Sequence, residues 1–183
     1  MSQKRAIVGQ ERASGFAGRL LPRNSVRRVA VTFVLILAVL LPLALFSGGW
    51  SGWDPVTRTV AATAGACARF LGIDATVDGS VIRLPSRSLS VDPQCTAVDL
   101  LAVYAAIVLA YPLPWKKRLM GLALGVVVLQ AANLGRLVGV AWASELLTDR
   151  PFYFIHDYLF EFGMVFVALM AWAVWLSLAR RTA

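Results

Sequence analysis

Charged residues, cysteines and histidine are scarce in this sequence. Only 15% of its 183 residues are charged, and it contains two Cys and a single His. Two cysteines are too few for a secreted scaffold built on disulfides, and with one His they do not give the ligand spacing of a zinc site. The sequence has no Cys-x-x-Cys pair, no Gly-rich phosphate loop and no Gly-x-Ser-x-Gly segment. A thiol oxidoreductase is therefore disfavoured, and we expect neither a metal nor another cofactor.

Apolar residues dominate instead. They make up 58% of the chain, and the mean hydropathy is +0.69. This composition excludes a disordered chain and indicates an all-α integral membrane protein. The first apolar run, 29–46, covers about 27 Å as a helix and is longer than the apolar core of a secretory signal, so we interpret it as a retained anchor. We predict four transmembrane helices, at about 29–46, 96–114, 119–144 and 158–179.

The basic residues behind the net charge of +8 lie mainly before or after the predicted spans. Three groups of basic residues would share one face of the membrane, namely Lys4, Arg5, Arg12, Arg19, Arg23, Arg27 and Arg28 before the first span, Lys116, Lys117 and Arg118 after the second, and Arg180 and Arg181 after the fourth. By the positive-inside rule both termini are cytoplasmic. The predicted organisation is a basic arm (1–28) that contacts membrane lipid, one transmembrane catalytic domain (29–179) and a short tail (180–183). The charge needs no nucleic acid as partner.

The predicted outer cap, residues 47–95, has structure of its own. Val56, Val60, Ala64, Cys67 and Leu71 recur at helical spacing, which predicts a short amphipathic helix over 55–71 lying on the membrane. Residues 76–82 alternate around Asp78-Gly79, which predicts a small β-hairpin.

Cys95 is the first candidate for chemistry. It follows Asp92-Pro93, a typical helix start, so it is predicted to lie in the first turn of the second span. The positive end of a helix favours the thiolate, the form of Cys that attacks carbonyls. Two alternatives stay open, namely a small buried hydrophobic residue and a disulfide with Cys67.

Arg136 is the one basic residue inside a predicted span. An arginine at mid-helix costs about 2.5–3.5 kcal/mol to insert, so it is paired or functional by default. It would either form an ion pair with Asp99 or Glu161 or serve in catalysis.

His156, the single histidine, opens the fourth span and is the candidate acid/base, although it could also be an ordinary interfacial residue. Asp99, four residues after Cys95, could hold Arg136 or His156. Asp99, Asn133, Asp157 and Glu161 are therefore candidates for supporting roles.

Under the predicted topology Cys95, Arg136 and His156 reach the same outer layer. A thiol, an imidazole and a guanidinium suit acyl transfer, since the thiolate attacks a carbonyl, the imidazole protonates the leaving amine and the guanidinium stabilises the oxyanion.

Three segments carry a family resemblance, namely Gln94-Cys95-Thr96-Ala97, Asn133-Leu134-Gly135-Arg136 and the His at the start of the last span. Between about 92 and 179 the chain resembles the exosortase/archaeosortase family of membrane-embedded sorting enzymes, and its four spans resemble short forms such as exosortase H. The resemblance implies Cys95, Arg136 and His156 as the catalytic residues. It also implies substrate proteins with a C-terminal sorting signal, made of a short motif, a transmembrane helix and a basic tail.

The function expected from the sequence is a cysteine protease or transpeptidase that cleaves such signals through a thioacyl intermediate. It would act at the outer, periplasmic side of the bacterial inner membrane. The alternative is a non-enzymatic binding module or transporter component in which Arg136 is the counter-ion for an anionic ligand. The recognition motif, the acceptor nucleophile and the oligomeric state stay open.

Overall fold

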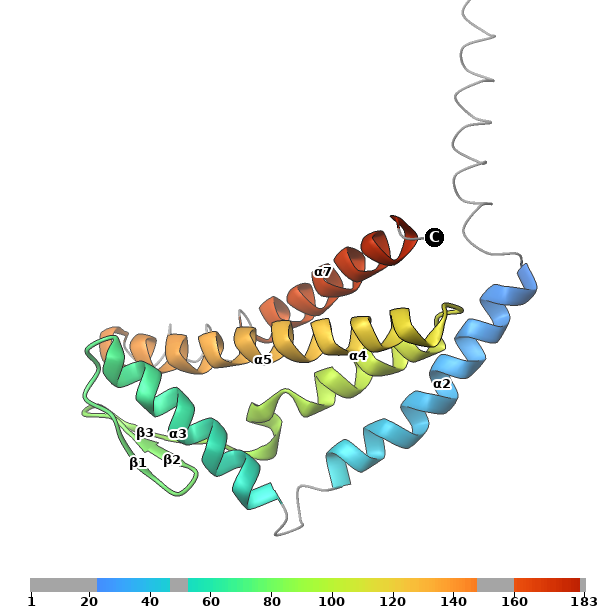
Figure 1. Cartoon of the computed structure of the whole chain (residues 1–183). Helices are drawn as coiled ribbons and strands as arrows, with labels where there is room; N and C mark the ends of the chain where they lie inside the picture. Colours follow the sequence, from blue (N-terminus) through green and yellow to red (C-terminus); the bar gives the residue numbers. More distant parts are fainter. Residues whose placement is uncertain (1–22, 47–52, 148–159, 182–183) are drawn as a thin grey trace, which may run out of the picture.

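A computed structural model describes residues 23–46, 53–147 and 160–181 of the chain. Its elements, in chain order and as Figure 1 shows them, are α2 (Arg23–Phe46), α3 (Asp54–Phe70), β1 (Thr76–Asp78), β2 (Val81–Arg83), β3 (Ser88–Ser90), the 3₁₀-helix η3 (Pro93–Thr96), α4 (Val98–Ala110), α5 (Trp115–Leu146) and α7 (Phe160–Arg181). The fold is thus mostly helical, as predicted. The predicted basic arm lies outside the described residues except for its last part.

Long apolar helices support the prediction of a membrane protein. Within the described chain, α5 and the part of α7 from Phe162 to Arg181 are long and apolar enough to cross a membrane. The number of four spans stays a prediction, because α4 has 13 residues and measures about 20 Å, less than the 30 Å of a typical hydrocarbon core.

The α4 helix is shorter than the predicted span of 96–114 at both ends. At its C-terminal end Tyr111 is extended, with φ −73° and ψ 134°, as the residue before a proline usually is. Pro112 and Pro114 then prevent the helix from continuing into α5. At its N-terminal end the backbone breaks at Ala97, a feature that shapes the candidate site.

One end of the molecule joins the start of α5 to the end of α7. Lys117 donates from Nζ to the carbonyl oxygen of Ala179 (2.6 Å), and Trp175 donates from Nε1 to the carbonyl oxygen of Lys117 (2.8 Å). Arg180 donates to the hydroxyl of Tyr111 (2.9 Å). The segments that carry two of the basic groups assigned to one face of the membrane therefore meet at this end, which fits an antiparallel path of α5 and α7.

Glycines let two aromatic rings pack against α5. Tyr104 of α4 lies against Gly125, and Trp175 of α7 lies against Gly121, each so closely that a Cβ at the glycine would overlap the ring. Both rings are buried, at 2% and 0% exposure. The core between α4, α5 and α7 thus depends on the absence of side chains at these positions.

The opposite end carries the small cap formed by α3 and the sheet (Figure 1). The sheet has the order β1-β2-β3 and is antiparallel, with Val77 opposite Ile82 and Ile82 opposite Leu89. The predicted hairpin is confirmed, and Gly79 at its turn has φ +63°, which glycine adopts without strain. The third strand was not predicted.

The predicted helix over 55–71 is confirmed as α3, but only part of the predicted stripe is buried. Its buried residues are small, namely Thr57, Ala61, Ala64, Gly65 and Ala68. Of the predicted stripe, Val56 and Leu71 are exposed by 41% and 62%. The reason is close packing, because Gly65 lies against the Val77 side chain of β1 and leaves no room for a Cβ.

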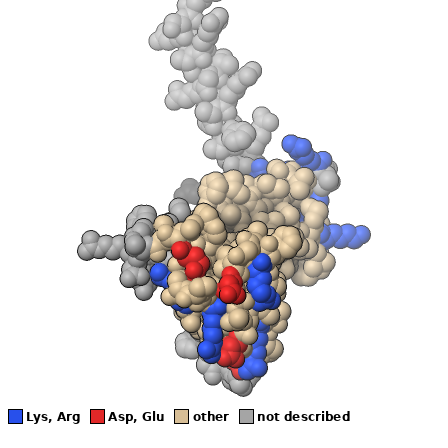
Figure 2. Space-filling view, turned by 90° about the vertical axis from the view of Figure 1, so that its left-hand side faces the viewer, with Lys and Arg blue, Asp and Glu red and all other residues tan. Residues whose placement is uncertain are grey.

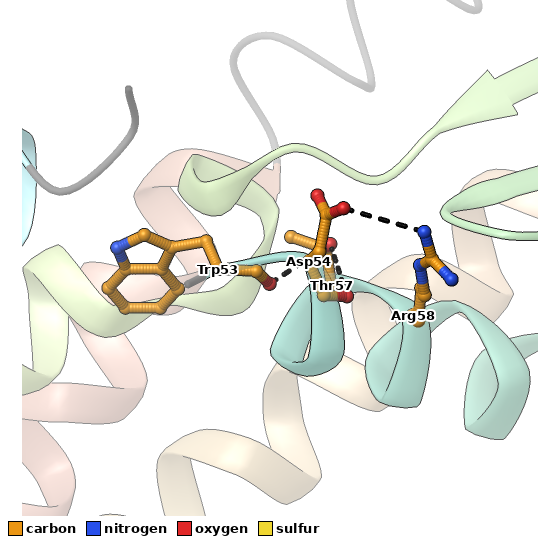
Figure 3. A network of polar contacts seen from close by, with 4 residues as sticks. All are labelled: Trp53, Asp54, Thr57 and Arg58. Atoms are coloured by element: carbon orange, nitrogen blue, oxygen red, sulfur yellow. Dashed lines mark hydrogen bonds and ion pairs between the residues drawn. The ribbon is translucent and has the colours of Figure 1, made fainter. Parts of the chain in front are cut away.

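The start of α3 is held by a local network (Figure 3). Thr57 donates from Oγ1 to the carbonyl oxygens of Trp53 and Asp54, each at 3.2 Å, and Arg58 pairs with the Asp54 carboxylate at 3.4 Å. An acidic residue in the first turn also matches the positive end of the helix dipole. These contacts fix the helix that forms one wall of the candidate site.

Charged side chains of both signs gather on the cap end of the molecule (Figure 2). Acids in the cap include Asp54, Asp74, Asp78, Asp92 and, at the end of α5, Glu145. This mixture differs from the basic end around Lys117 and Arg180 and agrees with the charge distribution predicted from the sequence.

Candidate active site

Cys95 lies in η3, between the sheet and α4. Its N–H donates to the carbonyl oxygen of Asp92 (2.8 Å), and its Sγ lies 4.0 Å from the carbonyl oxygen of Ser90, at the end of β3. The side chain is half-buried. The predicted position in the first turn of the second span is wrong in detail, because Cys95 lies in a separate 3₁₀ turn that precedes the α-helix.

Ala97 separates the two helices. Its φ is 56°, the one positive φ outside glycine among the described residues. A left-handed alanine costs about 1–2 kcal/mol, and such strain is found most often at functional sites. The spacing of four residues predicted that Asp99 and Cys95 share one helical face. Because the helix breaks at Ala97, Asp99 in the first turn of α4 does not continue the face of Cys95.

Two amide side chains of α5 hold the carbonyl groups of η3. Asn133 donates from Nδ2 to the carbonyl oxygen of Cys95 (2.8 Å), and Gln130 donates from Nε2 to that of Thr96 (3.2 Å). Asn133 is 1% exposed, and its Oδ1 is buried without a hydrogen-bond partner. The polypeptide on both sides of the Cys95–Thr96 peptide bond is thus attached to α5.

Gln130 was missed in the sequence analysis. A signal was present, because Gln130 and Asn133 are two amides at a spacing of i, i+3 in the stretch 119–135, which is otherwise apolar, and this spacing places them on one face. A polar group without a hydrogen bond in an apolar environment is costly, so two amides in such a stretch are expected to bind other polar groups.

Arg136 lies one helical turn beyond Asn133 on α5. Its Nε is buried and has no hydrogen-bond partner. Within the described part of the chain the guanidinium forms no ion pair, so the predicted alternative of a pair with Asp99 is not found. At 1.5 Å per residue, Arg136 is about 30 Å along α5 from Lys116. This is about one hydrocarbon thickness from the basic end of the molecule.

The two cysteines are both free thiols. Cys67 on α3 and Cys95 in η3 are each half-buried, and the disulfide that the sequence left open is not formed. Cys95 also packs against the core cluster beneath α3 and the sheet, as Val60 and Leu134 do.

A hollow of about 280 Å³ lies between α3 and α5. Three residues of α3 and four of α5 line it, namely Thr59, Val60, Thr63, Gln130, Ala131, Asn133 and Leu134. Its α5 wall includes both amides that bind the backbone of η3. The side chain of Asn133 therefore extends from the wall of the hollow to the carbonyl oxygen of Cys95.

Three of the predicted site residues are not placed. His156 and Asp157 lie outside the described residues, and so does the side chain of Glu161, whose backbone lies in the first turn of α7. Among the residues that are described, no group of three or more His, Cys, Asp or Glu could hold a metal ion.

Comparison with known proteins identifies one family. A family model described as transmembrane exosortase matches residues 13–176, which is most of the chain and includes the Cys95, Asn133 and Arg136 segments. No curated protein and no solved structure matches the chain.

Proposed function

The chain belongs to the transmembrane exosortase family of membrane-embedded, cysteine-type sorting transpeptidases, and on that premise we propose that it cleaves C-terminal sorting signals with Cys95 as nucleophile. Arg136 and His156 are the proposed partners of the thiol. The substrates are membrane-tethered exported proteins that end in a short motif, a transmembrane helix and a basic tail.

The proposed reaction has two steps. The Cys95 thiolate attacks the carbonyl carbon of the scissile peptide bond, a C–S bond forms, and Arg136 stabilises the negative charge on the carbonyl oxygen. The C–N bond then breaks, and the His156 imidazolium donates a proton to the leaving amine. The resulting thioester is resolved by water or by an amine, which regenerates the thiol.

The observation that carries the proposal is the attachment of Cys95 to the helix that bears Arg136. The hydrogen bond from Asn133 to the Cys95 carbonyl ties the nucleophile to α5 one turn before Arg136. Side chains at i and i+3 on a helix have Cβ atoms about 5–6 Å apart. A substrate carbonyl bound at Cys95 is therefore within reach of a long guanidinium side chain that has no ion-pair partner among the described residues.

The proposed site acts at the outer, periplasmic face of the inner membrane, with both termini in the cytoplasm. Support comes from the two ends of the described fold. The basic residues around Lys117 and Arg180 gather at one end and the cap lies at the other, while Cys95 is attached to the middle of α5 through Asn133. By the positive-inside rule the first end is cytoplasmic.

The test is processing of a tethered substrate in cells. A protein with a C-terminal transmembrane helix and basic tail is co-expressed with the full chain or its variants, and cleavage is followed by a shift in mass. Cys95→Ala should abolish cleavage, and Cys67→Ser, the matched control at the other half-buried thiol, should retain it. Normal cleavage by Cys95→Ala overturns the proposal.

A binding module is the second candidate function, and the Arg136 side chain favours it too. A guanidinium without an ion-pair partner in the described chain is suited to an anionic ligand. The two functions predict different reactivities for the Cys95 thiol. Rapid labelling of Cys95 by a thiol reagent added from outside supports the enzyme, and an inert Cys95 supports the binding module.

A further inference from the structure

We propose that the hollow between α3 and α5 is the subsite for one uncharged, apolar side chain of the substrate, next to the bond that Cys95 attacks. This inference rests on the proposed function and adds the kind of residue that the site selects. It depends on three properties of the hollow, which are its position, its size and the chemistry of its lining.

The position is set by Gln130 and Asn133. Both line the hollow, and both donate a hydrogen bond to the backbone of η3, to Thr96 and Cys95 respectively. Val60 and Leu134 also line it and pack against the same core cluster as Cys95. A peptide bound at the thiol therefore has an adjoining residue within reach of this hollow.

The size fits one residue. Pockets that enclose drug-sized ligands measure about 300–1,000 Å³. At about 280 Å³ the hollow lies just below this range, so it has room for one side chain with its backbone but not for a helix.

The lining is uncharged. The hydroxyls of Thr59 and Thr63 donate to carbonyl oxygens of their own helix, at 2.6 and 2.8 Å, and leave the wall with no free donor of this kind. No Asp, Glu, Lys or Arg is among the seven lining residues. A charged side chain would lose its hydration there without gaining an ionic partner.

The test uses peptidyl chloromethyl ketones whose last residue is Gly, Leu or Asp, with the full-length protein in detergent. Alkylation joins the Cys95 sulfur to the methylene carbon and releases chloride. The Leu probe should label Cys95 about tenfold or more faster than the Gly probe, since apolar pockets discriminate by this factor, and the Asp probe should be slower still. Equal rates with all three probes overturn the subsite.

A pair of variants locates the preference. Ala131→Phe fills the hollow from α5 and should remove the preference for Leu over Gly. Ala123→Phe, at an exposed position of the same helix outside the hollow, should keep it. A preference that survives Ala131→Phe also overturns the subsite.

Iodoacetamide separates the two proposals. This reagent has no side chain to place, so it should label Cys95 at the same rate in Ala131→Phe and in the unchanged protein. A reactive Cys95 with no side-chain preference contradicts the subsite alone. A Cys95 that no reagent labels contradicts the proposed function.

Discussion

Asn133 joins the two parts of the candidate site, because its Nδ2 donates a 2.8 Å hydrogen bond to the carbonyl oxygen of Cys95. The donor belongs to α5, the acceptor to a four-residue 3₁₀ turn, and the donor side chain is 1% exposed. The bond fixes the backbone of the proposed nucleophile against the helix that carries Arg136.

Removing the Asn133 amide should impair activity more than stability. Asn133→Ala leaves the Cys95 carbonyl without its donor, and we expect the free energy of unfolding to fall by about 1–3 kcal/mol. A small displacement of a reacting group can slow catalysis by about 10²-fold. The measurements are the rate of substrate cleavage and thermal unfolding in detergent.

Ser177→Ala is the control for Asn133→Ala. The Ser177 hydroxyl donates to a carbonyl of its own helix at an exposed position, so its loss should change neither quantity. If Asn133→Ala cleaves substrate at the normal rate, the amide is a structural feature only.

Replacing Arg136 by Lys should remove most of the activity. Lysine keeps the charge but lacks the planar fork of donors that a guanidinium presents to an oxyanion. The loss of one oxyanion donor typically lowers kcat about 10²–10³-fold. Arg83→Lys, at an exposed pair with Asp78 in the cap, should retain the normal rate of cleavage. Equal rates for the two variants would contradict a direct role of Arg136.

Gly125→Ala should destabilise the helical core. The new Cβ would overlap the ring of Tyr104, which is 2% exposed, and overpacking of this kind costs about 1–3 kcal/mol. Gly135→Ala is the matched control on the same helix, because a Cβ there meets no atom within 4 Å. Alanine favours helix over glycine by about 1 kcal/mol, so Gly135→Ala should raise the unfolding temperature. A lower unfolding temperature in both variants would contradict the described packing of α4 against α5.

Replacing Ala97 by Gly should stabilise the protein, although glycine usually weakens a helical region. Ala97 has φ 56°, a conformation that costs alanine about 1–2 kcal/mol and glycine very little. Ala106→Gly in the middle of α4 is the opposite case and should lower the free energy of unfolding by about 1 kcal/mol. Thermal unfolding shows whether each variant raises or lowers the stability of the protein. A fall for Ala97→Gly as large as that for Ala106→Gly would show that the chain does not break at this position.

Several elements of the fold were predictable because their signals are local. The Asp78-Gly79 pair predicted the hairpin turn, and Gly79 adopts the positive φ that such a turn requires. Apolar spacing predicted the extent of α3 to within a residue. The buried face of α3 was predictable only in part. Ala64 belongs to the predicted stripe, whereas Ala61 and Gly65 do not and are buried where small residues allow close packing.

The sequence singled out two residues that the structure brings into contact, but it did not predict the backbone that carries them. The motifs singled out Cys95, Asn133 and Arg136, and the structure ties Cys95 to Asn133. The helix break was missed because Ala97 is neither Gly nor Pro, the residues that usually mark such a change. The strand at Ser88–Ser90 was missed because two serines flank one leucine, and its pairing with β2 is a tertiary effect.

The most direct test of the account is to identify the acyl group on Cys95. The full-length protein is incubated with a tethered substrate, quenched with acid and digested, and the peptide that contains Cys95 is analysed by mass spectrometry. This peptide should carry the new C-terminus of the substrate as a thioester, and the adduct should be absent from Cys95→Ala and present in Cys67→Ser. Cleavage of the substrate with an unmodified Cys95, or an adduct on Cys67, would contradict the account.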